Sequence, residues 1–189
     1  MKNKIKIHFI GISGIGMSGI AELMLDQGYE VQGSDLVLND NSKRLERKGI
    51  HIFLGHSKKN IDNIDAVVFS SAINKKNPEI ITALNKKIPL LSRADMLAEL
   101  MKNKKCIAIA GSHGKTTTTS LVGNILNYGQ LDPTIVNGGI INSLSKNNRY
   151  GKGEWMVVEA DESDGSFLKL PHQISIITNL DIEHLDFYK

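Results

Sequence analysis

Short apolar runs alternate with segments of helical periodicity along most of the chain. The apolar runs are bounded by glycine, proline or polar residues and predict strands at residues 5–10, 29–33, 50–54, 66–69 and 89–91. The segments between them predict helices at residues 15–27, 41–48, 78–86 and 93–101. Because this alternation is typical of parallel sheets, we predict a Rossmann-like α/β domain with helices on both faces of its sheet.

A second domain is expected from about residue 103. The polar stretch at residues 102–105 precedes a new predicted strand at 106–110 and a second glycine-rich turn. Further strands are predicted at residues 155–160 and 173–178, with a loop-rich connection at 137–153. We therefore expect a first domain at residues 1–102 and a P-loop-type α/β domain at 103–189. Few residues follow its last predicted strand, so we expect this second domain to be incomplete.

Composition narrows the classes of function. The formal net charge is only +3, the lysines occur in scattered pairs, and the chain has five Phe and one Trp. Because nucleic-acid sites gather basic and aromatic side chains, we expect solvated helix ends and no nucleic-acid surface. No apolar stretch approaches the ~20 residues that span a bilayer, so we also expect no membrane association.

The first residues are basic and then apolar, as in an export signal, but the glycines and His8 in the apolar part argue against export. The single cysteine, Cys106, excludes an internal disulfide and favours a reducing, cytoplasmic location. Its apolar surroundings favour a buried core thiol over a nucleophile.

The first glycine-rich turn contains Gly11, Gly14 and Gly16, between a predicted strand and a predicted helix. Glycines there let a diphosphate approach the backbone, and a helix N-terminus favours anions. Asp35 ends the next predicted strand, where a Rossmann-type fold would hold a ribose hydroxyl. The order GxxGxG inverts the usual dinucleotide pattern, so nucleotide binding and simple turn geometry both remain open.

The second turn, Gly111-Ser112-His113-Gly114-Lys115-Thr116, predicts ATP binding. A triphosphate needs backbone amides, a cation at its β and γ groups and a hydroxyl on Mg²⁺, and glycines, Lys115 and Thr116 supply these. Ile109 stands where the usual phosphate loop has its first glycine, so the loop is a shortened variant.

Acidic residues follow the predicted strand at 155–160. Glu159 is the first of them, and an acid delivered beside a phosphate loop commonly holds Mg²⁺, so we predict it as a metal ligand. The later carboxylates at 161–164 could equally serve to solvate a loop. His184 follows another predicted strand, and a lone histidine there is more often a hydrogen-bonded structural residue than a metal ligand.

Six ordered blocks resemble the Mur ligases, in particular the branch that adds L-alanine. The blocks are HFIGISGIGMSGIAE, SSAINKKNPE, SRADMLAELM, GSHGKTTTTS, VVEADESDGSF and ITNLDIEHLDFY, and the resemblance covers essentially all 189 residues. Ser13, Asp95 and Ser112 depart mildly from the family pattern. The first glycine block favours the alanine-adding branch over the related ligase that recycles murein tripeptide.

The resemblance implies two nucleotide sites. The first would hold the UDP part of UDP-N-acetylmuramate, through Gly11, Gly14, Gly16, Asp35, His56, Ser70, Ser71 and Ala72. The second would bind ATP through Gly111, Ser112, His113, Gly114, Lys115, Thr116 and Thr117. Thr116, Glu159 and His184 would hold magnesium, and the implied catalytic residues are Lys115, Glu159 and His184.

The implied reaction begins when ATP phosphorylates the lactyl carboxylate of UDP-N-acetylmuramate. The amine of L-alanine then attacks the acyl phosphate. We expect this chain to hold the first domain and only part of the central one, and so not to complete the reaction alone. A UDP-sugar-binding module without catalysis is the alternative, and a nicotinamide-dependent oxidoreductase is a weaker one.

Overall fold

The computed structural model describes residues 4–141, 146–160 and 165–182, with the side chains of 138–147 and 166 left undescribed. The contacts group the chain into two compact units, Met1–Met96 and Leu97–Lys189. The expected domain limits, 1–102 and 103–189, stay a prediction. Within the described part of the chain, no helix has both the length and the apolar character needed to cross a membrane.

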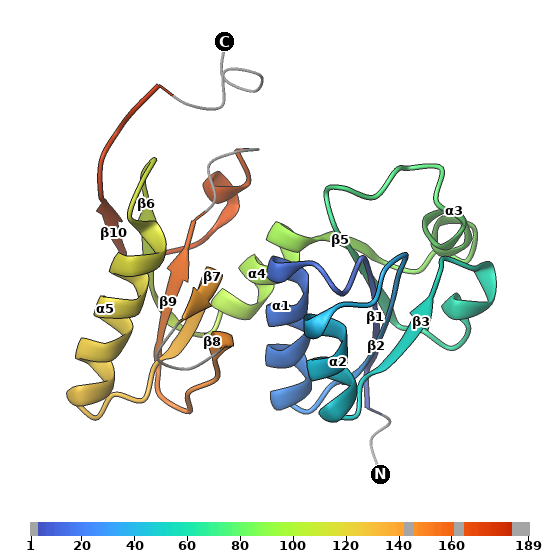
Figure 1. The fold of residues 1–189 in the computed structure, drawn as a ribbon, viewed down its shortest axis with the longest axis horizontal. Helices are drawn as coiled ribbons and strands as arrows, with labels where there is room; N and C mark the ends of the chain where they lie inside the picture. Colours follow the sequence, from blue (N-terminus) through green and yellow to red (C-terminus); the bar gives the residue numbers. More distant parts are fainter. Residues whose placement is uncertain (1–3, 142–145, 161–164, 183–189) are drawn as a thin grey trace. The chain divides into compact units, whose positions relative to one another are not determined.

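The first unit is a five-stranded parallel sheet in the order β3-β2-β1-β4-β5 (Figure 1). Its elements are β1 (Lys6–Ile10), α1 (Ile15–Asp26), β2 (Glu30–Asp35), α2 (Asp40–Arg47), β3 (His51–Leu54), η1 (Lys58–Ile61), β4 (Ala66–Phe69), α3 (Pro78–Asn85), β5 (Leu90–Ser92) and the start of α4 (Arg93–Met101). The predicted strands and helices are confirmed to within two residues at each end.

Local sequence explains where two of these helices begin. The Asn39 side chain caps α2 by accepting from the amides of Asn41 and Ser42, and the Ser42 hydroxyl accepts from the Asn39 amide in return. Asn77 caps α3, whose first residue is Pro78. Buried apolar residues then hold η1 and α3 on the sheet: Ile10, Ile61, Ile64, Val67, Ile80 and Ala83.

The strand order predicts a ligand crevice at the carboxyl end of β1. The chain moves outward from β1 to β3 and then returns to the other side of β1 with β4. Ligands of open α/β sheets bind where strand order reverses in this way, at the carboxyl ends of the strands. The first glycine-rich turn follows β1 and residues 70–72 follow β4, so both reach this crevice.

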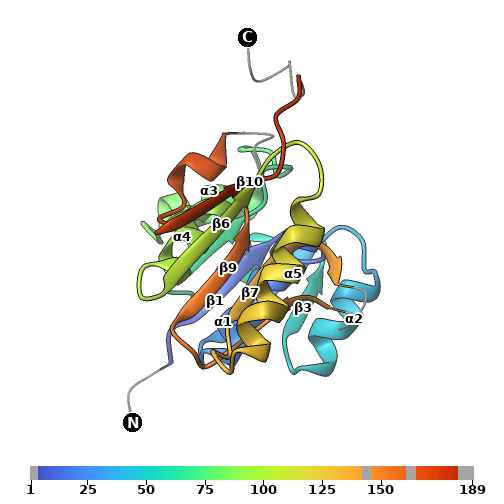
Figure 2. The same ribbon diagram turned by 90° about the vertical axis from the view of Figure 1, so that its left-hand side faces the viewer.

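The second unit is also a five-stranded sheet, in the order β10-β6-β9-β7-β8 (Figure 2). Its elements are β6 (Lys105–Ala110), α5 (Lys115–Tyr128), β7 (Thr134–Ile141), β8 (Lys146–Arg149), β9 (Trp155–Glu159), η2 (Ser166–Lys169) and β10 (Ile174–Ile177). Helix α5 packs on the sheet, where Val122 and Leu126 meet a core of Ile107, Ile109 and Val157.

The loop-rich connection expected at residues 137–153 is wrong in part. Strand β7 runs into this segment, and β8 pairs with it antiparallel, which also makes the second sheet mixed at one edge. The asparagines and glycines suggested turns. Antiparallel pairing with β8 nevertheless holds β7 extended into this segment, because tertiary pairing overrides weak local preference.

Candidate functional site

The first glycine-rich turn packs closely against the residue that follows β4, Ser70. Gly11 has φ +79°, and a Cβ there would lie 3.2 Å from the Cβ of Ser70. Its amide donates to the Ser34 carbonyl over 2.8 Å, which ties the turn to β2. A side chain at position 11 would both strain the backbone and crowd Ser70. Structure and sequence therefore agree that glycine is needed there.

Asp35 is joined to the same turn. Its Oδ2 accepts from the Ser13 amide over 2.8 Å, and the Ser13 carbonyl accepts from the side-chain amides of Asn39 and Asn41. Asp35 thus lies beside the glycine turn, as its position after β2 predicts. Its contact to a ribose hydroxyl stays a prediction.

A cation lies against the start of α1. Gly14 occupies the N-cap and provides no side chain to the first-turn amides, and a Cβ on Gly16 would come 3.3 Å from Nη1 of Arg93. A helix N-terminus and a guanidinium together favour an anionic group. Sequence reasoning missed Arg93, although it directly follows β5 at the same edge of the sheet as the glycine turn.

His56 is anchored through one ring nitrogen. Its Nδ1 lies 3.0 Å from the Ser34 hydroxyl and 3.2 Å from Oε2 of Glu79. Of the three predicted residues after β4, Ser70 contacts the glycine turn, whereas Ser71 and Ala72 are exposed beyond it. The structure therefore brings Gly11, Asp35 and Ser70 close to one crevice and ties His56 to the polar residues beneath it.

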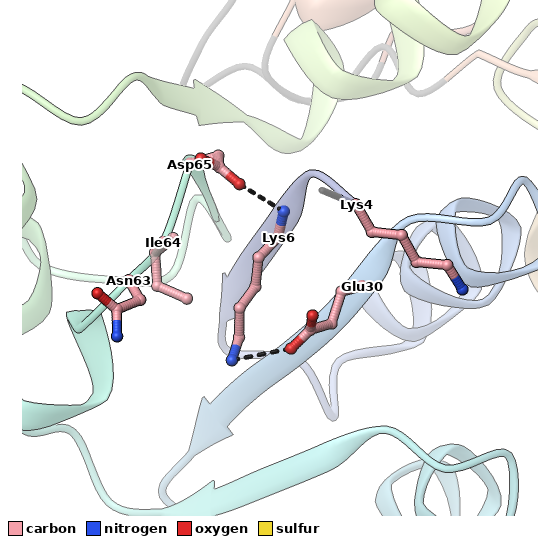
Figure 3. Close-up of a pocket in the computed structure, with 6 residues that line it drawn as sticks. All are labelled: Lys4, Lys6, Glu30, Asn63, Ile64 and Asp65. Atoms are coloured by element: carbon pink, nitrogen blue, oxygen red, sulfur yellow. Dashed lines mark hydrogen bonds and ion pairs between the residues drawn. The ribbon is translucent and has the colours of Figure 1, made fainter. Parts of the chain in front are cut away.

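A polar pocket lies at the opposite edge of this sheet, at the amino ends of the strands (Figure 3). Three of its charged residues are held by one another: Lys6 Nζ pairs with Glu30 over 2.9 Å, and the Lys6 amide donates to Asp65 over 2.7 Å. None of the predicted site residues lines it. We assign it no function.

The second glycine-rich turn joins β6 to α5, as predicted. Gly111 and Gly114 have φ values of +128° and +80°, which other residues rarely adopt. The Lys115 ammonium donates to the carbonyls of Gly111 and Ser112, over 2.6 and 3.1 Å, and so lies folded over the loop. A lysine held there can turn toward a phosphate that enters the loop.

Two oxygen-bearing side chains meet beside this loop. The Thr116 hydroxyl donates to Oε2 of Glu159 over 2.9 Å, because β9 runs parallel to β6 and ends next to it. Hydroxyl and carboxylate oxygens are ligands that Mg²⁺ accepts when phosphates supply the others. Among the described residues, no group of three or more His, Cys, Asp or Glu could hold a metal by itself.

The segment after β10 holds the phosphate loop. Asn179 accepts from the His113 amide over 2.9 Å and donates to the His113 carbonyl over 3.0 Å. Thr178 donates to that carbonyl over 2.7 Å, and the Ser112 hydroxyl accepts from the Asp181 amide. Sequence reasoning missed these contacts, although Asn179 also follows a strand at the same edge. His184 and the carboxylates at 161–164 lie outside the described residues.

Cys106 is a core thiol, as expected. It is 1% exposed, and desolvation raises the pKa of its thiol to about 11, against a smaller lowering by Lys104. Because a thiol reacts as its thiolate, Cys106 is unsuited to nucleophilic catalysis.

Two family models cover nearly the whole chain. Residues 6–105 match the model described as Mur ligase family, catalytic domain, and residues 109–189 match the Mur ligase middle domain. Among solved structures, the UDP-N-acetylmuramate-alanine ligase of Thermotoga maritima superposes with a TM-score of 0.90 at 36% identity, over 97% of this chain and 43% of that one. The UDP-N-acetylmuramate:L-alanyl-gamma-D-glutamyl-meso-diaminopimelate ligase of Neisseria meningitides also gives 0.90, at 26% identity over 99% of this chain and 64% of that one.

Curated relatives share the sequence as well as the fold. UDP-N-acetylmuramate--L-alanine ligases of Azorhizobium caulinodans and Xanthobacter autotrophicus are 60% and 59% identical over 183 residues, which is 97% of this chain. The chain spans 39% of the length of each of these relatives. Taken with a Rossmann-like first unit and a middle unit built around a phosphate loop, the matches show that the chain belongs to the Mur ligase family.

Proposed function

We propose that this chain forms the UDP-sugar-binding and ATP-binding parts of a UDP-N-acetylmuramate:L-alanine ligase. The observation that carries this proposal is the 60% identity to an enzyme of that name over 97% of the chain. The phosphate loop and the glycine turn, each at the carboxyl end of a central strand, support it. Because the chain spans 39% of that enzyme, the complete reaction is proposed for a protein of the relatives' length.

In the first unit, the proposed ligand is the UDP part of UDP-N-acetylmuramate. The diphosphate would lie at the turn of Gly11, Gly14 and Gly16, where the first amides of α1 face it. Asp35 would accept from a ribose hydroxyl while it holds the Ser13 amide. His56 and residues 70–72 would line the remainder of the site.

In the second unit, residues 111–117 would bind ATP. Lys115 would exchange its carbonyl partners for the β- and γ-phosphates, and Thr116 and Glu159 would hold Mg²⁺, with His184 as a further proposed ligand. The ion would neutralise charge on the transferring phosphoryl group and orient it. The cytoplasm, where ATP is available, is the proposed location, and the buried thiol of Cys106 is consistent with a reducing compartment.

The proposed reaction joins the lactyl carboxylate of UDP-N-acetylmuramate to the amine of L-alanine, with ATP as the phosphoryl donor. A lactyl carboxylate oxygen attacks the γ-phosphorus of ATP, ADP leaves, and an acyl phosphate forms. The amine of L-alanine then attacks the acyl carbon, phosphate leaves, and the amine proton is lost. Catalysis rests on positioning and on charge neutralisation by Lys115 and its neighbours, because carboxylate and phosphate both carry negative charge.

Calorimetric titration tests both sites. We expect the chain to bind UDP-N-acetylmuramate, and to bind a non-hydrolysable ATP analogue more tightly with Mg²⁺ than without it. Glu159→Gln should abolish the gain from Mg²⁺ and leave UDP-sugar binding unchanged. A folded chain that ignores UDP-N-acetylmuramate would refute the substrate assignment.

The ligase that recycles murein peptide is the second candidate, because the Neisseria structure superposes as well as the alanine ligase does. Its name contains the same UDP-sugar, so the acceptor distinguishes the two. A protein of the relatives' length should form product with L-alanine and none with the tripeptide. The reverse result would favour the recycling ligase.

A further inference from the structure

A buried polar cluster lies beneath the predicted uridine nucleotide site and was not expected from the sequence. Glu79, at the start of α3, is fully buried, as are His8 on β1 and Ser34 on β2. His56, whose side chain is 10% exposed, is the member that reaches the surface. The cluster therefore connects the sheet interior to a residue proposed to touch the ligand.

Every neighbour of the Glu79 carboxylate is able to donate a hydrogen bond. Its Oε1 accepts from the Asn60 side-chain amide over 2.7 Å and from the Ser57 amide over 3.3 Å. Its Oε2 accepts from the Ser34 hydroxyl over 2.6 Å and lies 3.5 Å from Nε2 of His8. A carboxylate surrounded only by donors is held in its ionised form.

The proton positions on His8 follow from its neighbours. Gln32 Nε2 donates to the Asn60 carbonyl over 2.8 Å, and since a carbonyl only accepts, the orientation of the Gln32 amide is fixed. The same nitrogen lies 3.2 Å from Nδ1 of His8, which must then be the acceptor. The His8 proton is therefore on Nε2, the nitrogen that faces Glu79.

The same reasoning fixes His56. The Ser34 hydroxyl donates its only proton to Glu79, so toward Nδ1 of His56 it can only accept. The Glu79 carboxylate, 3.2 Å from that nitrogen, also only accepts. Nδ1 must carry a proton, and in a neutral ring Nε2 then has a lone pair. Both contacts of this ring within the described residues use Nδ1, which leaves Nε2 for a ligand.

The pKa of Glu79 agrees with this arrangement. Desolvation by burial raises it, but the nearby His8 N–H and the hydrogen bonds from Ser34 and Asn60 lower it by more, so that the net direction is downward. The carboxyl group is thus ionised at neutral pH and remains an acceptor toward His56.

We propose that Glu79 is a positioning residue that locks His56 in the Nδ1–H tautomer, so that Nε2 accepts a hydrogen bond from the nucleoside part of the ligand. The inference rests on the proposed UDP site and specifies its chemistry. A lone pair repels a phosphate oxygen, so the partner is an uncharged donor: the imide N–H of uracil or a ribose hydroxyl. Glu79 does not touch the ligand itself.

The tautomer can be measured without any ligand. Long-range ¹H–¹⁵N spectra of the chain at a pH of about 8, above the usual histidine range, distinguish protonated from unprotonated ring nitrogens. We expect Nδ1–H for His56 in the wild type. Glu79→Gln introduces an amide that can donate to Nδ1, so the Nε2–H form should gain population. Nε2–H in the wild type would overturn the proposal, whatever the variants do.

UDP binding tests whether the tautomer of His56 affects affinity for the ligand. Glu79→Gln should weaken UDP binding by about tenfold, the loss of one hydrogen bond of about 1.4 kcal/mol. Glu46→Gln, an exposed carboxylate of the same unit, is the matched control and should bind as the wild type does. Equal UDP affinity of the wild type and the Glu79 variant would contradict the proposal.

Ligand analogues identify the donor. We expect His56→Ala to weaken UDP binding, and this effect to disappear for whichever analogue lacks the donor: N3-methyl-UDP for the imide, or 2′-deoxy- or 3′-deoxy-UDP for the ribose. Persistence of the full effect with all three analogues would overturn the proposal. Failure of the wild type to bind UDP at all would instead refute the proposed function, and the tautomer measurement separates the two failures.

Discussion

A buried carboxylate stabilises a fold only if its neighbours replace the water that it has lost. Glu79 meets this condition through donors that come from three separate parts of the first unit: β2, the segment around His56, and η1. The capping residue Asn77 fixes the turn from which Glu79 projects. At the scale of single residues, the functional crevice therefore depends on a polar interior rather than on an apolar one.

This dependence predicts a particular response to acid. Because the pKa of Glu79 is lowered in the folded state, its contribution to stability is complete above the unfolded-state pKa and is lost as the pH falls through the folded-state value. We expect the protection factors of the amides in β1 and β2, corrected for the intrinsic exchange rate, to decrease as the pH falls below 4.5, the ordinary glutamate value.

Glu79→Gln should remove most of this pH dependence and cost roughly 1–3 kcal/mol at neutral pH, because donors lose a charged acceptor. Glu46→Gln should keep the wild-type profile. The histidines facing Glu79, His8 and His56, are present in both variants, so the difference between the profiles isolates the carboxylate. Identical acid profiles for the two variants would contradict this account.

Arg93 permits a second prediction at this scale. Its guanidinium lies against Gly16 at the N-terminus of α1, where the proposed diphosphate would bind. Arg93→Met should weaken UDP binding by roughly tenfold, the usual size of a charge-assisted hydrogen bond, and should leave uridine binding unchanged. Lys43→Met, which removes an exposed cation from α2, is the control. An equal loss for UDP and uridine would indicate a packing role for Arg93.

At the scale of elements, the periodicity of apolar residues predicted those strands and helices whose limits are set by local sequence. The strands and helices of the first unit follow buried runs and caps, and so their limits were predictable within two residues. The β7–β8 pairing was missed, because Asn137 and the glycines after it favour turns, whereas the pairing that extends β7 comes from β8, farther along the chain.

The positions of the candidate site residues divide in the same way. The place of Lys115 and Thr116 at the turn between β6 and α5 was predictable, because the loop and its helix are contiguous in sequence, while their binding roles stay a prediction. Arg93, Glu79 and Asn179 were not predictable in this way, because their roles arise from contacts with Gly16, His56 and His113 respectively, each distant in sequence. Only the order of strands brings such residues to the same edge of a sheet.

The contact between two loops of the second unit gives a prediction at this scale. Asn179 holds the amide and the carbonyl of His113, so Asn179→Ala should loosen the phosphate loop. We expect about tenfold weaker binding of the ATP analogue, from two hydrogen bonds of about 1 kcal/mol each offset in part by water, and faster amide exchange in the loop. Asn124→Ala, at an exposed position of α5, should change neither. Faster exchange without loss of affinity would disprove the link between loop order and binding.

At the scale of the whole molecule, each compact unit has its own sheet, its own core and its own glycine turn. A chain of this kind need not unfold in one step. A ligand that binds only the folded form stabilises its unit by about 2.7 kcal/mol at a concentration of 100 times Kd. In differential scanning calorimetry, UDP should therefore raise the transition of the first unit, and the ATP analogue with Mg²⁺ that of the second.

Variants of the two proposed nucleotide sites show which calorimetric transition belongs to which unit. Lys115→Ala should abolish the shift caused by the ATP analogue and preserve the shift caused by UDP, since the Lys115 ammonium donates to the carbonyls of Gly111 and Ser112 in the phosphate loop. Arg93→Met should preserve the shift caused by the ATP analogue and, since tenfold weaker binding leaves about 1.4 kcal/mol at the same UDP concentration, roughly halve the shift caused by UDP. If either variant abolished both shifts, the two nucleotide sites would have to be energetically coupled within this chain, and the assignment of one independent site to each unit would be wrong.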